Sequence, residues 1–197
     1  MLVADVDAAK RVRADLHVEG IPSTDAAVQA AAADPGADVT TLGIPLTSNE
    51  LAALRSSGIS MDRRSPIRYW VRVGEPSRFG GIWVDPPGSS GQVVAILNSD
   101  PGALALARCL DDGVGVRYVA ATQSVADELA LVARIGADGT ELRSSGIAFQ
   151  GVGIGVRASV MVVIVGVTGV TDAIRAKLIA RYGDTIVVEE QAPITPA

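Results

Sequence analysis

"VVAILNSDPGALALARCLDDGVGVRYV" at residues 93–119 and "VVIVGVTGVTDAIRAKLIARYGDTIVV" at residues 162–188 match in length and in the positions of their apolar residues. Both begin and end with short β-branched runs, which are typical of strands, and both carry a helical pattern between these runs. A further strand-like run precedes each segment, "FGGIWVD" at 79–85 and "FQGVGIGVR" at 149–157. The sequence therefore predicts two β-β-α-β units, each opened by a hairpin.

Polar residues mark where several helices should begin. Thr47 and Glu50 have the spacing of a capping box. Asp100 and Thr171 precede the helical parts of the two repeated units and can cap them. Gly and Pro break the Ala-rich amino-terminal part into further helices, which is the usual effect of these two residues.

These patterns predict an α+β fold, in which a helical amino-terminal part is followed by two β-β-α-β units joined by a helix. A three-stranded sheet with one helix is marginally stable alone, so we expect the small sheets to pack with helices. The predicted amino-terminal region, first unit, connecting helix, second unit and extended tail occupy residues 1–78, 79–123, 124–147, 148–191 and 192–197.

Composition narrows the classes of partner. The chain has 197 residues, of which 48% are hydrophobic and 20% charged, so it can bury a core. Its formal charge of −5 argues against binding to nucleic-acid phosphates. The longest apolar stretch, residues 159–167, is too short for a membrane span. The amino terminus shows no apolar run of signal-peptide length, so localisation is unknown from the chain itself.

Residues that carry common catalytic or metal chemistry are few. The single histidine, His17, has no nucleophile elbow to accompany it, and one His with one Cys cannot supply a tetrahedral zinc site. We expect Cys109 to be an inert thiol in a helix core, the alternative being a reactive thiol. The acidic pairs at 111–112 and 189–190 lack the spacing of a calcium loop. The sequence predicts no catalytic residue and no metal ligand.

Two glycine patterns bear on cofactors. "GVGIGV" at 151–156 resembles a dinucleotide fingerprint, but a strand follows it where that motif requires a helix. "GVTGVTD" at 166–172 lies at a strand-to-helix turn without a lysine, which leaves ordinary helix capping or anion binding. The sequence predicts no cofactor.

Aromatic and basic residues suggest contact surfaces. Strand alternation places Phe79 and Trp83 on one face, which lies either under the amino-terminal helices or against a partner. Arg68 and Arg72 share one face of a short helix, the other face of which carries apolar residues including Trp70. These arginines form either a solvated helix face or a contact for an acidic partner.

A set of short phrases carries a family resemblance: "LGIPLTSNELAAL", "FGGIWVD", "QVVAILN", "VRYV", "LRSSGI", "VVIVGV" and "ARYGDTIVVEE". Together they resemble the non-catalytic amino-terminal regions, in part pro-regions, of secreted actinobacterial chymotrypsin-like (trypsin-like) serine proteases and their stand-alone relatives. The resemblance covers about residues 44–190. It implies a chain that helps a protease domain to fold and blocks its active site, with small sheets that pair with protease strands.

The resemblance also implies a contact region and a location. The strand that contains Ile186, Val188 and Glu190, followed by a tail kept extended by Pro193, would meet the protease. The protein would be secreted or associated with the cell envelope. Because no protease domain follows in this sequence, the partner would be bound either in cis in a longer product or in trans by a free-standing module.

Three functions therefore remain open. The first is a non-enzymatic protein-interaction module of the pro-region type, acting as a folding aid or inhibitor. The second is a free-standing α+β domain that binds a peptide or small ligand. The third is an enzyme that uses carboxylates or arginine in a cleft. An exposed strand edge would also allow self-association.

Overall fold

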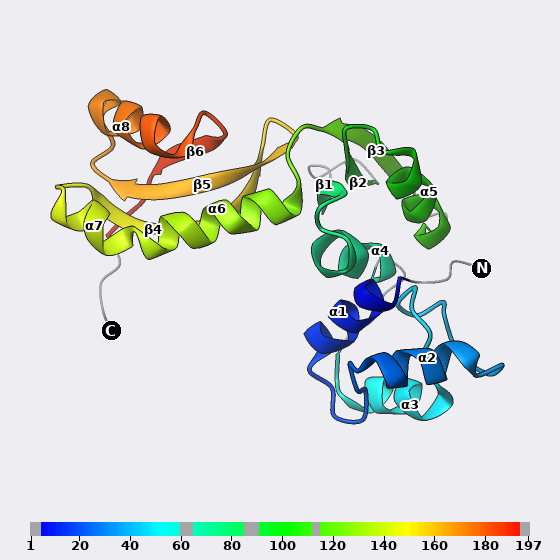
Figure 1. Ribbon diagram of the computed structural model, residues 1–197. Coiled ribbons are helices and arrows are strands. Elements are labelled where there is room, and N and C mark those ends of the chain that lie inside the picture. Colours follow the sequence, from blue (N-terminus) through cyan, green and yellow to red (C-terminus); the bar gives the residue numbers. More distant parts are fainter. Residues whose placement is uncertain (1–4, 60–64, 85–90, 112–114, 194–197) are drawn as a thin grey trace. The chain divides into compact units, whose positions relative to one another are not determined.

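The computed structural model describes residues 5–59, 65–84, 91–111 and 115–193 (Figure 1). These residues form helices and two three-stranded sheets, which confirms the predicted α+β class. The chain divides into two compact units, the first ending at residue 125 and the second beginning at residue 126. Each unit contains one β-β-α-β motif.

The amino-terminal part of the first unit is helical, as predicted. The capping box of Thr47 and Glu50 is present in both directions, with N–H to oxygen distances of 3.3 and 2.8 Å. The short helix rich in arginine continues as one π-helical segment, η1. The helices of this part are α1 (Val6–Leu16), α2 (Asp25–Ala33), α3 (Ser48–Ser56), α4 (Ser65–Tyr69) and η1 (Trp70–Gly74).

The first sheet has the order β1-β2-β3 and packs with helix α5. Strand β1 is antiparallel to β2, which confirms the predicted hairpin, and β2 is parallel to β3. The predicted turn at 86–91 lies outside the described residues except for its last position. The elements are β1 (Phe79–Val84), β2 (Gln92–Leu97), α5 (Pro101–Leu110) and β3 (Val116–Ala121).

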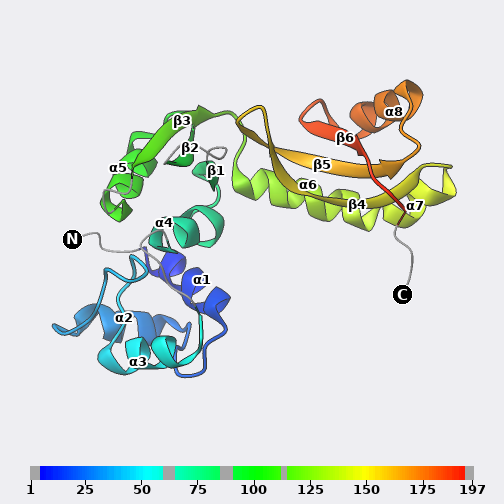
Figure 2. The same cartoon turned by 180° about the vertical axis from the view of Figure 1, so that it is seen from behind.

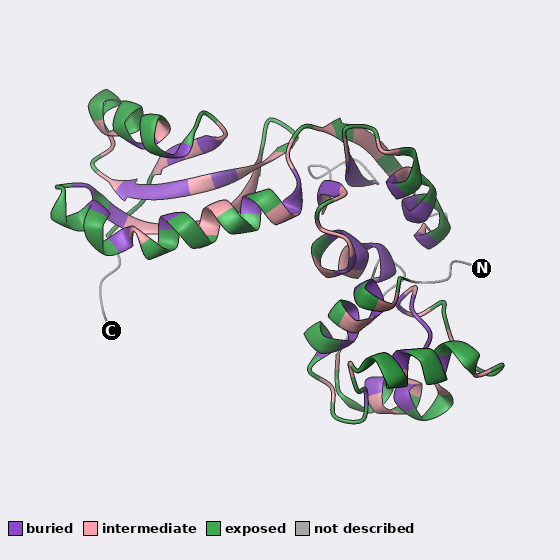
Figure 3. Ribbon diagram, viewed as in Figure 1, coloured by how far each residue is buried: buried purple, intermediate pink, exposed green. Residues whose placement is uncertain are grey.

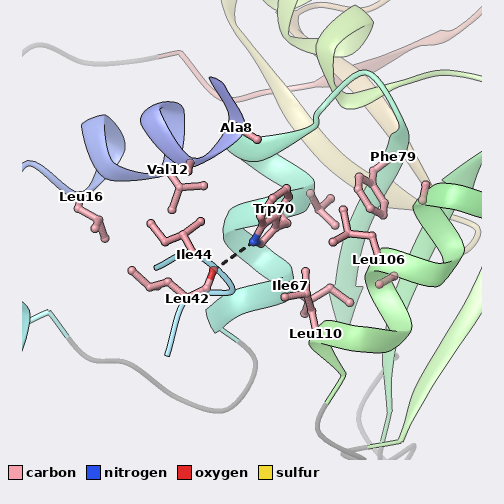
Figure 4. Packing of buried hydrophobic residues seen from close by; sticks show 14 of the residues in the cluster. Ala8, Val12, Leu16, Leu42, Ile44, Ile67, Trp70, Phe79, Leu106 and Leu110 are labelled. Atoms are coloured by element: carbon pink, nitrogen blue, oxygen red, sulfur yellow. Dashed lines mark hydrogen bonds between the residues drawn. The ribbon is translucent and has the colours of Figure 1, made fainter. Parts of the chain in front are cut away.

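One hydrophobic core joins the helices of the first unit to its sheet (Figure 4). Trp70 lies near its centre, only 2% exposed, and its indole Nε1 donates a hydrogen bond to the Leu42 carbonyl at 3.1 Å. Gly43 adopts a positive φ of 70°, and a Cβ there would meet the side chains of Trp70 and Leu110. The glycine therefore allows this loop to pass close beneath the indole.

The predicted common face of Phe79 and Trp83 is wrong because β1 contains a bulge. The register shifts between residues 79 and 81, so that Phe79 lies opposite Ile96 while Trp83 lies opposite Val93. Residues 93 and 96 point to opposite faces of β2, and directly opposed residues share a face. Phe79 therefore faces the helices of the first unit, and Trp83 faces the other side of the sheet.

Cys109 is exposed, contrary to the predicted core thiol. The buried stripe of α5 consists of Ala103, Leu106, Ala107 and Leu110, which follow helical spacing. Position 109 falls outside this stripe although its sequence neighbours are apolar.

The second unit repeats the motif as a sheet of order β4-β5-β6 with a parallel β5–β6 pair (Figures 1 and 2). The predicted connecting helix is divided near Asp138 into two helices, α6 and α7. The elements are α6 (Val125–Ala137), α7 (Gly139–Ser144), β4 (Ala148–Arg157), β5 (Val160–Thr168), α8 (Asp172–Tyr182) and β6 (Ile186–Glu190).

The core of the second unit lies on one face of this sheet, which we call the inner face. Residues from α6, α7 and α8 pack there against alternate residues of the strands, including Val163, Val165 and Val188. The burial colouring shows the same arrangement, with buried positions along β5 and exposed outer sides on the helices (Figure 3). The opposite, outer face carries the remaining alternate residues.

Candidate partner-binding edge of the second sheet

The predicted contact residues of the first unit are only partly at its surface. Phe79 is 0% exposed and belongs to the core. Trp83 is half-buried, and its indole Nε1 is buried with no hydrogen-bond partner among the described residues. The two aromatic rings therefore do not form a joint contact surface.

The arginines near the π-helix differ in their environment. Arg72 is exposed and Arg68 is half-buried. Arg78, which follows them, donates to Asp100 at 2.8 Å and to Glu75 at 2.6 Å. The Arg78 hydrogen bond is the main cause that lowers the pKa of Asp100 to about 2. Arg78 therefore serves to connect η1 and α5, and the basic surface is smaller than the sequence suggests.

The predicted contact strand β6 is largely occupied within its own unit. Ile186 and Val188 are 4% and 3% exposed and belong to the inner-face core. Glu190 is exposed, and its carboxylate accepts hydrogen bonds from the backbone N–H groups of Gly169 and Val170, both at 2.8 Å. These bonds lower the pKa of Glu190.

This carboxylate occupies the place that an anion would take. The backbone donors at the start of the β5–α8 connection are those that the glycine pattern at 166–172 offered for anion binding. Glu190 already accepts from two of them. Pro193, also a predicted contact, is exposed in the tail beyond β6.

The free edge of β6 is short and partly covered. The strand has five residues. Arg175 of α8 donates from Nη1 to the Val188 carbonyl at 2.8 Å. Side chains that cover edge carbonyls, charged residues and short length all oppose the addition of another strand.

Strand β4 is the other edge of the same sheet, and it differs from β6 in length and in charge. One of its carbonyls is also covered, since Arg143 Nε of α7 donates to the Phe149 carbonyl at 3.2 Å. The strand has ten residues and pairs with β5 along nearly its whole length. Between positions 148 and 156 it contains no charged residue. In the described part of the chain no strand pairs with its other side. From Gly151 to Val156 its free side therefore presents backbone groups that no described strand pairs, along an uncharged stretch.

Glycines keep the outer face of β4 flat. Gly151, Gly153 and Gly155 alternate with inward residues such as Val152, which packs against the core. A Cβ at Gly151 or Gly153 would meet nothing within 4 Å, so the space beside them is open. Glycine inside a strand is a common mark of a place where another backbone approaches closely.

The outer face as a whole is half-exposed and crossed by one ion pair. Val162, Ile164 and Val187 are half-buried there. Arg157 of β4 contacts Glu189 of β6, with Nη2 to Oε2 at 2.6 Å. This hydrogen bond lowers the pKa of Glu189. The pair links the two edge strands over β5, and each charge has an opposite charge beside it.

Sequence reasoning did not identify β4 as a contact edge. The glycines at 151–156 drew attention only as a dinucleotide fingerprint. The useful signal was the absence of charge in a long strand with glycine at every second position, since natural edges usually carry protective charges.

The chemistry available at β4 is main-chain hydrogen bonding to an extended segment. Among the described residues, no group of three or more His, Cys, Asp or Glu side chains could hold a metal ion. No helix in the described ranges is long and apolar enough to cross a membrane. Comparisons of the chain with family models, curated proteins and solved structures gave no match.

Proposed function

We propose that this protein is a non-enzymatic interaction module that binds an extended segment of another protein along the free side of β4. The single observation that carries the proposal is a ten-residue edge strand without charge from position 148 to 156. Adding a strand there would satisfy unpaired backbone groups, and such main-chain bonding is a recurrent mode of peptide recognition. Strand β6 has five residues and ends in Glu189 and Glu190, so it is the less suitable edge.

The proposed partner is a chymotrypsin-like serine protease domain, which the module would help to fold or would inhibit, in cis or in trans. The supporting observation is the resemblance of the phrases between residues 44 and 190 to protease pro-regions. A secreted or cell-envelope location follows from that partner. A strand-binding edge suits this role because it recognises backbone geometry before a partner's side chains are fully packed.

The test uses refolding of a secreted actinobacterial chymotrypsin-like protease. The purified chain is added to the denatured protease, and recovered activity is measured; a second assay measures inhibition of the native enzyme. We expect a gain in recovered activity, inhibition, or both. No effect in either assay would contradict the proposed partner, whereas binding of extended peptides without such an effect would favour a free-standing peptide-binding domain.

A matched pair of variants tests the edge itself. Gly151→Lys with Gly153→Lys adds two charges where a Cβ has open space, so the fold should persist. Val39→Lys with Ala130→Lys adds the same charges at exposed positions elsewhere. We expect the first pair to lose the effect on the protease and the second pair to keep it. Equal activity of both pairs, with circular dichroism showing folded chains, would exclude β4 as the contact.

A further inference from the structure

We propose that the chain forms a two-fold symmetric homodimer, in which β4 pairs antiparallel with β4 of a second copy and α6 packs beside the second copy's α6. The dimer covers the edge to which the proposed function assigns partner binding. Dimerisation would therefore compete with binding of the partner. This regulatory consequence rests on the proposed function, whereas the dimer is argued independently of it.

The sequence of β4 is self-complementary about Gly153. In an antiparallel pair with its two-fold axis at this residue, Gly151 lies opposite Gly155, and Val152 lies opposite Ile154. Directly opposed residues share a face, so glycines meet on the outer face and β-branched residues meet on the inner face. A two-fold interface requires such self-complementarity.

Helix α6 provides a second surface next to this edge. In an α-helix each residue is rotated by about 100° from the one before. Leu131 and Ile135 point to the sheet, where they join the core. On one flank, Arg134 lies over the ring of Tyr182 of α8 at 5.3 Å, which identifies the side facing α8.

The opposite flank of α6 is apolar and faces away from α8. Leu129 and Gly136 are rotated by about 140° and about 160° from Arg134 on the helix, by the same rule of about 100° per residue. Leu129 is 48% exposed, and Gly136 and Ala133 are also exposed. A Cβ at Gly136 would lie 3.9 Å from Cγ1 of Val152, so this flank lies beside β4. Both ribbon views show α6 running along β4 (Figures 1 and 2).

A second copy fits this combined surface better than a single peptide strand does. A peptide would cover the edge of β4 but leave the apolar flank of α6 exposed, whereas a second copy supplies a strand and a helix at once. The small residues Ala133 and Gly136 allow two helices to approach closely, within the usual 8–10 Å range of helix packing. The chain carries a net charge of −5, but neither residues 150–156 of β4 nor Leu129, Ala133 and Gly136 of α6 are charged, so two copies meet at the centre of this surface without like-charge repulsion.

The resulting assembly would be one six-stranded sheet with the helices of both copies on the same side. The axis at Gly153 is perpendicular to the sheet, since opposed residues share a face. The inner faces of the two copies therefore become continuous. The two copies of α6 lie antiparallel near the axis.

Sedimentation velocity over a range of concentrations tests the dimer. The wild-type chain should shift toward twice its mass of 20.2 kDa as concentration rises. Leu129→Arg puts a charged side chain into the apolar surface that the dimer buries, and the cost of desolvating it should weaken association by at least about tenfold. Ala130→Arg, on the solvent side of α6, should leave association unchanged. A monomer at every concentration, or a dimer that Leu129→Arg leaves intact, would overturn the proposal.

Cysteine cross-linking tests the register, in a Cys109→Ser background that removes the exposed native thiol. Gly153→Cys places two thiols across the axis at a Cα separation of about 5 Å, which suits a disulfide. Gly151→Cys separates them by about 13 Å, which is too far. Oxidation should yield a covalent dimer of the first variant only; equal yields, or none, would refute this register.

The protease assay separates this inference from the proposed function. Leu129→Arg disrupts the helix contact but leaves the β4 edge intact, so it should keep or increase the effect on the protease, while Gly151→Lys with Gly153→Lys should lose both association and that effect. A dimer without any protease effect would remove only the proposed partner. A protease effect from a strictly monomeric wild-type chain would remove only the dimer.

Discussion

Replacing Glu128 with glutamine should stabilise the protein at neutral and alkaline pH. Glu128 lies in the first turns of α6, on the side that also carries Leu131 and Ile135. It is 2% exposed, and its Oε2 has no hydrogen-bond partner in the part of the chain that the structure describes. Burial, with a smaller contribution from the charge of Asp127, raises the pKa of Glu128 from 4.5 to about 7.

The sign and size of the effect follow from this shift. A carboxyl whose pKa is raised by folding contributes stability that is fully present below its unfolded pKa, near 4.5, and is lost as pH rises through the folded value. The full shift corresponds to about 3 kcal/mol lost from the free energy of unfolding at pH 8, and to less than about 1 kcal/mol at pH 5. Glu128→Gln cannot ionise and should avoid this loss.

Denaturant unfolding at pH 5 and pH 8 measures the difference. Far-ultraviolet circular dichroism is the appropriate signal, because both tryptophans, Trp70 and Trp83, belong to the first unit and their fluorescence reports on that unit. Glu19→Gln, at an exposed position, is the control for loss of a carboxylate. If the Glu128→Gln variant and the wild type lost the same stability between the two pH values, the reasoning about Glu128 would be refuted.

Three further predictions concern the supports of each unit. Arg13 and Glu50 form a buried ion pair at 2.7 Å, and Arg13→Met should cost about 3–5 kcal/mol because it leaves a buried carboxylate unpaired, as fluorescence-monitored unfolding would show. Gly43→Ala should destabilise more than Gly58→Ala in the same assay, since both glycines have positive φ but only the first also lacks space for a Cβ; equal losses would contradict the packing at Gly43. Glu190→Gln should reduce the loss of stability on acidification. The bonds that lower the pKa of Glu190 contribute stability that is present above pH 4.5 and is lost as pH falls through the folded pKa. If the free energy of unfolding of this variant fell with acid as steeply as that of the wild type, the Glu190 bonds would be excluded as a source of the acid sensitivity.

The elements of the fold were accessible to sequence reasoning because their signals are local. The cap residues Thr47, Asp100 and Thr171 each accept a hydrogen bond from the first turn of the helix they precede. The period of the apolar residues changes from helical to alternating where β1 begins. Capping residues and the spacing of apolar residues are local signals of this kind, and they predict which elements form and in what order.

The face of a strand or helix to which a side chain points was harder to predict from the sequence, because it depends on small irregularities of the backbone. One extra residue at Gly80 reverses the parity of β1, so Phe79 and Trp83 point to opposite faces. A Cβ at Gly80 would collide with Ala121, which explains the glycine but is visible only once β3 is in place. On α5, an offset of one residue from the buried stripe exposes Cys109.

The candidate contact edge could not be predicted, because an edge is a property of strand order and not of a strand. The runs that became β4 and β6 are both apolar, and the sequence favoured β6 on account of the resemblance. In the structure, β6 supplies two core residues, Ile186 and Val188, and Glu190 closes the neighbouring loop. These contacts hold β6 within its own unit, and β4 is the longer edge of the sheet.

The two repeated motifs differ in the way their sheets are covered, and this difference locates the candidate surface in the second unit. In the first sheet, β2 is buried at five consecutive positions from Gln92 to Ile96, hence on both faces. In the second sheet, β5 alternates between buried inner positions such as Val163 and half-buried outer ones such as Ile164. A strand buried on both faces has no side chains left for a partner. The alternating sheet keeps an accessible face and, along β4, an edge at which Gly151 and Gly153 could take side chains without collision. The packing of the second unit therefore does not require glycine at these two positions, and the close approach of another backbone, as in the proposed strand addition, gives them a role.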